Sequence, residues 1–158
     1  MAKRIVETSD SLQTEALGAE LAAALKPGDI VLVRGELGAG KTTLVRGAAR
    51  ALGVIDPVTS PTFAVGHRYR GSEVTVSHLD LYRLAAPHEE EPALLDDYLG
   101  PGRIAFVEWP QDMRAELRNA RVIVTLAHCG CDNRRIEVCE RELPINGTMA
   151  SSRLELSQ

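Results

Sequence analysis

The sequence predicts an α/β fold, in which a mostly parallel β-sheet lies between helices and carries a few added antiparallel strands. Three features indicate this fold. A glycine-rich loop separates an apolar run from a helical stretch, strand-like and helix-like segments alternate along the chain, and turns at Gly71 and Gly130 predict two hairpins. Parallel neighbours need crossover connections, and we expect the intervening helices to supply them with right-handed geometry.

Composition bounds the domain organisation. The chain has 158 residues, of which 44% are apolar and 25% charged, so it suits one globular domain with a substantial core. We expect this domain to span residues 1–142, and the small and polar residues 143–158 to form a loose tail. A net charge of −4 argues against direct electrostatic binding of nucleic acid, which needs a basic face. Any contact with RNA is therefore expected through a partner.

The expected compartment is the cytosol. The longest apolar runs are far too short to span a membrane, and the first residues lack the apolar segment of a secretory signal. The three cysteines, an odd number, all occur late in the chain, so we expect no disulfide framework.

The N-terminal region predicts a strand followed by a helix. Ile5-Val6 indicates a short edge strand, and the run Thr8–Ser11 offers several N-cap residues. Apolar residues then recur at helical spacing until Lys26–Asp29 ends the segment. The face expected to be buried contains Leu12, Ala16, Leu17, Leu21, Ala24 and Leu25.

Residues 35–42, with the sequence GELGAGKT, fit the phosphate-binding loop pattern G-x-x-x-x-G-K-[ST]. The loop follows the apolar run Ile30–Val33 and precedes a helical stretch over 43–52 that Gly53 would cap. This strand-loop-helix context is the one that the motif requires. We therefore expect a P-loop NTPase-like three-layer sandwich.

The residue types of this loop match its chemistry. Glycines let successive backbone N–H groups turn toward a phosphate at a helix N-terminus, and a Cβ at Gly40 is expected to obstruct that cradle. Lys41 would supply positive charge to the β- and γ-phosphates, and the Thr42 hydroxyl would bind Mg²⁺. The predicted ligand is a nucleoside triphosphate with Mg²⁺.

Two acidic residues follow predicted strands. The run Arg103–Val107 and then Glu108 resembles a Walker B strand, which would place a carboxylate beside the Mg²⁺ on Thr42, either directly or through water. Glutamate replaces the usual aspartate. Asp80 ends the strand-like run 73–79, so it either points into the ligand crevice or caps a helix.

Other stretches leave their roles open. The run Ser60-Pro61-Thr62 is either a turn before a strand or the source of a hydroxyl that reaches the γ-phosphate. Trp109 belongs to the core, or contacts the nucleotide or a partner. Residues 87–100 predict a short helix with an acidic start and with Leu94, Leu95, Tyr98 and Leu99 on its apolar face.

Two further strand-like runs, 121–127 and 135–140, flank a turn that contains His128, Cys129 and Cys131. Histidine and cysteine are common metal ligands, so these three residues could indicate a metal site. A fourth ligand is missing and the spacing fits no structural zinc pattern, so we interpret the segment as a hairpin turn.

Taken together and in this order, four motifs resemble the TsaE family, the bacterial ATPase of tRNA threonylcarbamoyladenosine (t6A) biosynthesis. The resemblance extends from about Thr14 to Arg134, and the combination is more specific than a phosphate loop alone. The motifs are GELGAGKTT from Gly35, Ser60-Pro61-Thr62-Phe63, the heptapeptide HLDLYRL from His78, and Val107-Glu108-Trp109-Pro110.

The resemblance implies an ATP- and Mg²⁺-binding protein that acts with TsaB and TsaD. Its ATP hydrolysis would sustain repeated threonylcarbamoyl transfer to adenosine 37 of tRNA, while the transfer itself belongs to the partners. It implies that Asp80 acts near the γ-phosphate or the attacking water, and that Thr42 and Glu108 hold the metal. The implied nucleotide-binding residues are Gly38, Ala39, Gly40, Lys41, Thr42 and Thr43 in the loop, with Ser11, Thr14 and Arg134 beside it.

No arginine finger is assured by the sequence. Arg83 would supply one in cis, or a partner would complete the site, so we expect slow ATP hydrolysis by the chain alone. Two alternatives stay open. A small-molecule P-loop kinase would need an arginine-bearing lid, and none is evident. The second alternative is a nucleotide-dependent switch without significant turnover. The sequence lacks the Asn-Lys-x-Asp motif that recognises guanine, so ATP is favoured over GTP as the ligand.

Overall fold

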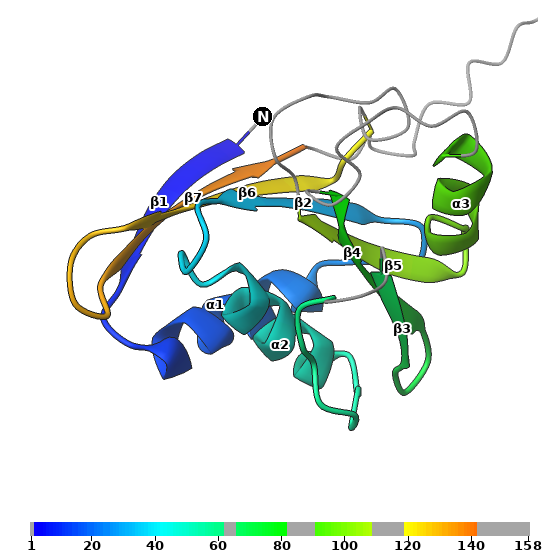
Figure 1. Ribbon diagram of the computed structural model, residues 1–158, viewed down its shortest axis with the longest axis horizontal. Coiled ribbons are helices and arrows are strands. Elements are labelled where there is room, and N and C mark those ends of the chain that lie inside the picture. Colours follow the sequence, from blue (N-terminus) through cyan, green and yellow to red (C-terminus); the bar gives the residue numbers. More distant parts are fainter. Residues whose placement is uncertain (1, 62–65, 82–90, 109–118, 142–158) are drawn as a thin grey trace, which may run out of the picture.

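The computed structural model describes residues 2–61, 66–81, 91–108 and 119–141, which form one seven-stranded sheet with three helices (Figure 1). The strand order across the sheet is β1-β7-β6-β2-β5-β4-β3. The elements, in chain order, are β1 (Ala2–Thr8), α1 (Ser11–Ala23), β2 (Ile30–Gly35), α2 (Lys41–Ala51), β3 (Gly66–Arg70), β4 (Thr75–Asp80), α3 (Glu91–Tyr98), β5 (Arg103–Glu108), β6 (Val122–His128) and β7 (Arg134–Glu140).

The centre of the sheet is parallel and its edges are antiparallel. Strands β6, β2, β5 and β4 pair in parallel, whereas β3 joins β4 and β7 joins β6 as antiparallel hairpins. The N-terminal strand β1 closes the other edge against β7 and is longer than the Ile5-Val6 prediction. The predicted α/β class and both hairpins are confirmed. Because the central strands are parallel, the carboxyl ends of β2, β5 and β4 lie at the same edge.

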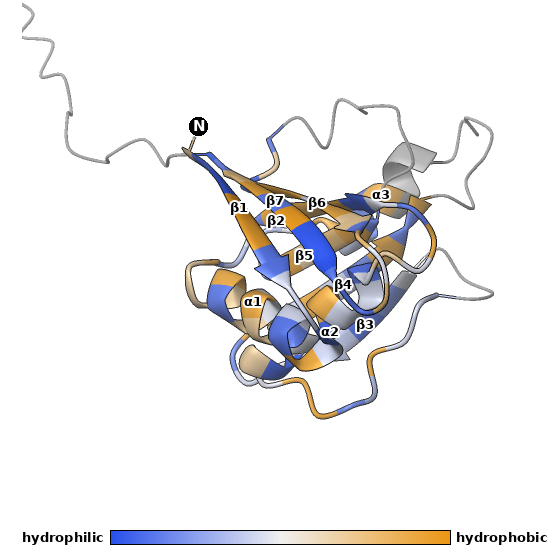
Figure 2. Cartoon of the chain, turned by 90° about the vertical axis from the view of Figure 1, so that its left-hand side faces the viewer, coloured by the Kyte–Doolittle hydropathy of each residue, from blue (hydrophilic) through white to orange (hydrophobic). Residues whose placement is uncertain are grey.

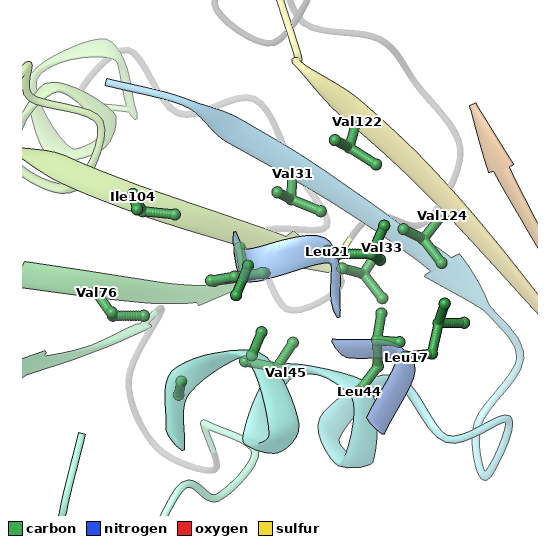
Figure 3. Packing of buried hydrophobic residues seen from close by; sticks show 14 of the residues in the cluster. Leu17, Leu21, Val31, Val33, Leu44, Val45, Val76, Ile104, Val122 and Val124 are labelled. Carbon is green, nitrogen blue, oxygen red and sulfur yellow. The ribbon is translucent and has the colours of Figure 1, made fainter. Parts of the chain in front are cut away.

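Helices cover both faces of the sheet, as the three-layer prediction requires. Figure 1 shows α1 and α2 below the sheet and α3 beyond its other face. Figure 3 shows leucines of α1 and α2 packed on valines of the central strands. A second, smaller core on the opposite face joins Leu95 of α3 to Leu32, Leu79 and Val107. The branched residues of the strands therefore form two cores on either side of one sheet.

Helix α1 begins as predicted but buries a different face from the one expected. Asp10 is its N-cap, and the carboxylate accepts a hydrogen bond from the Gln13 amide at 2.8 Å. Leu17 and Leu21 are buried as predicted. The predictions for Leu12, Ala16 and Ala24 were wrong, because these side chains are exposed. The buried face is completed instead by Thr14, Gly18 and Ala22.

Two glycines explain the orientation of α1. A Cβ on Gly18 would lie 2.1 Å from the Leu44 carbonyl oxygen, and one on Gly47 would lie 2.0 Å from the Glu15 carbonyl oxygen. The backbones of α1 and α2 therefore meet directly, and only small residues fit between them. Close packing turns the small face of α1 toward α2, so hydrophobicity alone predicted only part of the buried face.

The turn after α2 forms as predicted. Gly53 has a φ of +89°, its amide donates to the Arg50 carbonyl, and the Val54 amide donates to the Ala49 carbonyl. This pair of bonds satisfies carbonyl groups at the helix end. Figure 2 shows hydrophobic and hydrophilic residues on both α1 and α2. Within the described ranges, no helix is long and apolar enough to cross a membrane.

Candidate functional site

The phosphate-loop pattern occupies the connection between β2 and α2. Gly35, Gly38 and Gly40 have φ values of +149°, +80° and +100°, which other residues rarely adopt. A Cβ on Gly35 would lie 2.7 Å from the Leu126 carbonyl oxygen. A Cβ on Gly40 would lie 3.6 Å or more from its nearest protein neighbours, so protein contacts would tolerate it. The requirement for glycine at position 40 therefore comes from its backbone conformation.

Lys41, the first residue of α2, folds its side chain back over the loop. Its ammonium group donates hydrogen bonds to the carbonyl oxygens of Gly35 and Glu36. Both partners are uncharged, so a phosphate oxygen can replace them without breaking an ion pair. The lysine is thus close to the loop that the sequence predicts to hold phosphates.

Glu108, the last residue of β5, lies directly beside the loop. Its Oε1 accepts a hydrogen bond from the Thr42 hydroxyl at 3.3 Å, although 66 positions separate the two residues. The same oxygen lies 3.0 Å from Nε2 of His78 in β4. Glu108 is 5% exposed and His78 is fully buried. The structure therefore brings the loop threonine and the strand-end acid together, as the Walker B comparison predicted.

The oxygen atoms of Thr42 and Glu108 are a suitable donor set for Mg²⁺. This ion prefers oxygen ligands, and it is usually held by one or two protein groups together with phosphates and water. Across the part of the chain that the structure describes, no group of three or more His, Cys, Asp or Glu residues could hold a metal by itself. The chemistry fits a metal shared with a phosphate ligand better than one enclosed by protein alone.

Asp80 ends β4 and is the register partner of Glu108 on β5. Successive side chains of a strand alternate between faces, so Asp80 and His78 share the face of Val76, which packs against α1 and α2. Glu108 shares the equivalent face of β5 with Phe106. Both acids thus lie at one edge and on the face that carries Thr42. The helix-capping alternative for Asp80 involves residues 82–90, which lie outside the described ranges.

Arg134, the first residue of β7, contacts the phosphate loop from the side of the β6–β7 hairpin. Its Nε donates to the Ala39 carbonyl at 3.0 Å and its Nη2 donates to the Gly38 carbonyl at 3.2 Å. Its Nη1 donates to the carbonyls of Cys131 and Asn133 in the hairpin. The guanidinium therefore ties the hairpin to the loop.

The predicted residues of α1 lie at the start of that helix. Thr14 is buried, and its methyl group lies 3.8 Å from where a Cβ of Gly40 would stand. Its hydroxyl is engaged by the Thr8 hydroxyl at 2.8 Å and donates to the Asp10 carbonyl. Ser11 is exposed in the first turn, and Thr43 is half-buried next to Thr42. Thr14 thus flanks the loop, with its hydroxyl already used inside the protein.

Three residues given possible roles, Thr62, Arg83 and Trp109, lie outside the described residues, as does the tail beyond Leu143. His78 belongs to the sequence motif HLDLYRL, but no contact of its side chain was predicted. The available signal was alternation along the strand, which places His78 two residues before Asp80 on the same face of β4.

Comparisons with known proteins find relatives over most of the chain. The family model described as "Threonylcarbamoyl adenosine biosynthesis protein TsaE" matches residues 8–136. The TsaE protein of Bacillus subtilis is 36% identical over 78% of this chain and 77% of its own. The Streptomyces coelicolor TsaE protein is 42% identical over 67% of this chain and 73% of its own. Both are named tRNA threonylcarbamoyladenosine biosynthesis proteins.

A solved structure also shares the fold. The crystal structure of Bacillus subtilis YdiB superposes with a TM-score of 0.66 at 28% sequence identity. The superposition covers 87% of this chain and 84% of that one.

The guanidinium of Arg134 predicts a test of loop order. Arg134→Lys keeps the charge but replaces the planar guanidinium, which donates to four backbone carbonyls, by a single ammonium nitrogen that cannot reach all four. We expect hydrogen–deuterium exchange of the loop amides to become about tenfold faster, which corresponds to the loss of about 1.4 kcal/mol. Arg135→Lys, an exposed neighbour, is the control. Unchanged loop exchange in Arg134→Lys would show that the arginine does not restrain the loop.

Proposed function

The chain belongs to the TsaE family, and on this basis we propose that it binds and hydrolyses ATP within the machinery that makes N6-threonylcarbamoyladenosine at position 37 of tRNA. Membership rests on the family match over residues 8–136 and on relatives that are named for this biosynthesis. The observation that carries the nucleotide part of the proposal is the contact of Thr42 in the phosphate loop with Glu108 at the end of β5.

In this proposal the loop holds the phosphates of ATP. The backbone N–H groups of Gly38 to Thr43 face the phosphate oxygens at the N-terminus of α2, where the helix dipole favours negative charge. Lys41 exchanges its carbonyl partners for phosphate oxygens. Thr42 and Glu108 hold Mg²⁺, which supplies positive charge to the β- and γ-phosphates when it is bound. Ser11, Thr14 and Arg134 border the nucleotide.

Hydrolysis in such a site is mainly a matter of positioning and charge. Asp80 is proposed to orient the attacking water, because its register position opposite Glu108 places it at the same edge. Lys41 stabilises the negative charge that develops on the phosphoryl oxygens. The low exposure of Glu108 strengthens the attraction between its carboxylate and Mg²⁺, since opposite charges attract more strongly away from bulk water.

Partners are proposed to complete the site. Arg134 contacts the loop, but its guanidinium donates to four backbone carbonyls, so it can act on a phosphate only by giving up contacts that hold the loop. A missing cation costs orders of magnitude in phosphoryl-transfer rate. We therefore propose slow hydrolysis by the chain alone and faster hydrolysis with TsaB and TsaD. The net charge of −4 supports contact with tRNA only through these partners.

The role of Glu108 can be tested by Glu108→Gln, which keeps the size of the side chain and removes its charge. We expect Mg²⁺-dependent ATP hydrolysis to fall by about 100-fold or more, because the metal loses its anionic protein ligand. Binding of ATP in EDTA should change little. Glu7→Gln, on the exposed edge strand β1, serves as the control. Turnover equal to that of the unaltered protein would refute the assignment of Glu108.

Dependence on partners can be tested by measuring ATP hydrolysis with and without the purified TsaB–TsaD pair. We expect stimulation of about tenfold or more, a modest value beside the effect of a complete arginine finger. Lys41→Ala, assayed in the same mixture, excludes ATPase activity from the partners or from contaminants. Equal rates in the two mixtures would contradict the proposed division of labour.

A further inference from the structure

We propose that His78 is a positioning residue that holds the Glu108 carboxylate in the orientation in which it shares a Mg²⁺ with Thr42. The proposal rests on the function proposed above and adds a residue to its metal site. His78 would touch neither nucleotide nor metal, and would act through Glu108 alone.

The contact is short and enclosed by protein. Nε2 of His78 lies 3.0 Å from Oε1 of Glu108, and the two side chains are 0% and 7% exposed. The residues come from adjacent parallel strands: His78 faces Phe106 in the register, and Glu108 lies two positions further along β5. The imidazole therefore reaches diagonally across the sheet to the strand-end carboxylate, which diagonal neighbours on one face can do.

The direction of this hydrogen bond follows from the chemistry of the acceptor. A carboxylate that binds Mg²⁺ is ionised and only accepts hydrogen bonds, so in the proposed metal site Nε2 of His78 carries the proton. Oε1 of Glu108 then accepts two bonds, one from His78 and one from Thr42. Neither bond uses Oε2, so these two contacts leave the second carboxylate oxygen available to a metal ion or a metal-bound water.

The other nitrogen of His78 argues against a role in stability alone. Nδ1 is buried and has no hydrogen-bond partner among the described residues. An unsatisfied buried polar atom destabilises the folded protein by about 1–3 kcal/mol, so a histidine at this position lowers stability relative to an apolar residue that fills the same space. What the histidine adds, and an apolar residue cannot, is a donor aimed at Glu108.

Glutamate makes such a donor useful. Aspartate, the usual acid at this strand end, has one fewer rotatable bond, so a glutamate carboxylate must lose more freedom to reach a fixed position. Two hydrogen bonds to one oxygen restrain it. Hydrogen-bond partners of metal ligands orient those ligands, and their removal typically costs about 10- to 100-fold in metal affinity or activity.

The test compares variants of His78 by nucleotide calorimetry as Mg²⁺ is varied. His78→Leu removes the donor, His78→Gln keeps an N–H group at a similar reach, and His78→Asn keeps an amide that is too short. His67→Leu is the matched control, because His67 is the register neighbour of His78 on β3 and is only half-buried. The probe is a non-hydrolysable ATP analogue, and folding of each variant is checked by circular dichroism.

For His78→Leu we expect the Mg²⁺ concentration at half-saturation to rise about 10- to 100-fold, with affinity for the analogue in EDTA changed by less than about threefold. His78→Gln and His67→Leu should remain near the unaltered protein. Equal Mg²⁺ dependence in His78→Leu, or a loss in His78→Gln as large as in His78→Leu, would overturn the inference. If His78→Leu does not fold, His78→Gln against His78→Asn decides in the same way, since only the longer amide reaches Glu108.

The two proposals fail differently. If the unaltered protein does not bind the analogue in Mg²⁺, the proposed function fails. If it binds the analogue and all His78 variants bind it equally well, only the positioning role of His78 fails. Nitrogen-15 NMR of histidine-labelled protein gives a readout without mutation of the measured sample. It should show His78 protonated at Nε2, with the signal assigned by its absence from His78→Gln. Protonation at Nδ1 alone would overturn the inference.

Discussion

The arrangement of the site depends on the hydrogen bonds to the buried carboxylate of Glu108. Moving a carboxylate out of water costs several kcal/mol unless hydrogen bonds replace its hydration. Here the Thr42 hydroxyl and the His78 imidazole approach the same oxygen, from α2 and from β4. One acid at the end of β5 therefore joins the first turn of the loop helix to two central strands. The same contact makes the site suitable for Mg²⁺, because hydroxyl and carboxylate oxygens lie side by side.

The rest of the fold brings the loop to this acid. The parallel register of β2 and β5 pairs Val33 with Glu108, so the chain enters the loop two residues after it passes the acid. Glycines with positive φ then turn the backbone toward the start of α2. On the flank, Gly18 and Gly47 allow α1 to pack directly on α2, and Arg134 ties the β6–β7 hairpin to the loop. The loop is thus braced from both sides by elements distant in sequence.

Local patterns were the part that the sequence could predict. The loop, the strand-end positions of Asp80 and Glu108, both hairpins and the cap of α1 each follow from residues within a few positions of one another. Apart from the approach of Glu108 to Thr42, which the Walker B pattern predicted, contacts between distant residues did not follow from such local patterns. Arg134 contacts a carbonyl 95 positions away, and His78 meets Glu108 only because β4 and β5 are neighbours. The prediction of the buried face of α1 was partly wrong. Backbone contact at Gly18, rather than hydrophobicity, decides which face is buried.

We propose that the loop over residues 35–42 and the acid at position 108 together bind ATP with Mg²⁺. Isothermal titration calorimetry of the folded protein with ATP, in Mg²⁺ and in EDTA, tests it most directly. We expect saturable binding in Mg²⁺ at millimolar nucleotide or below, and weaker binding in EDTA, because Thr42 and Glu108 would hold the metal that neutralises the phosphates. No detectable uptake of Mg²⁺-ATP at millimolar concentration by well-folded protein would contradict it.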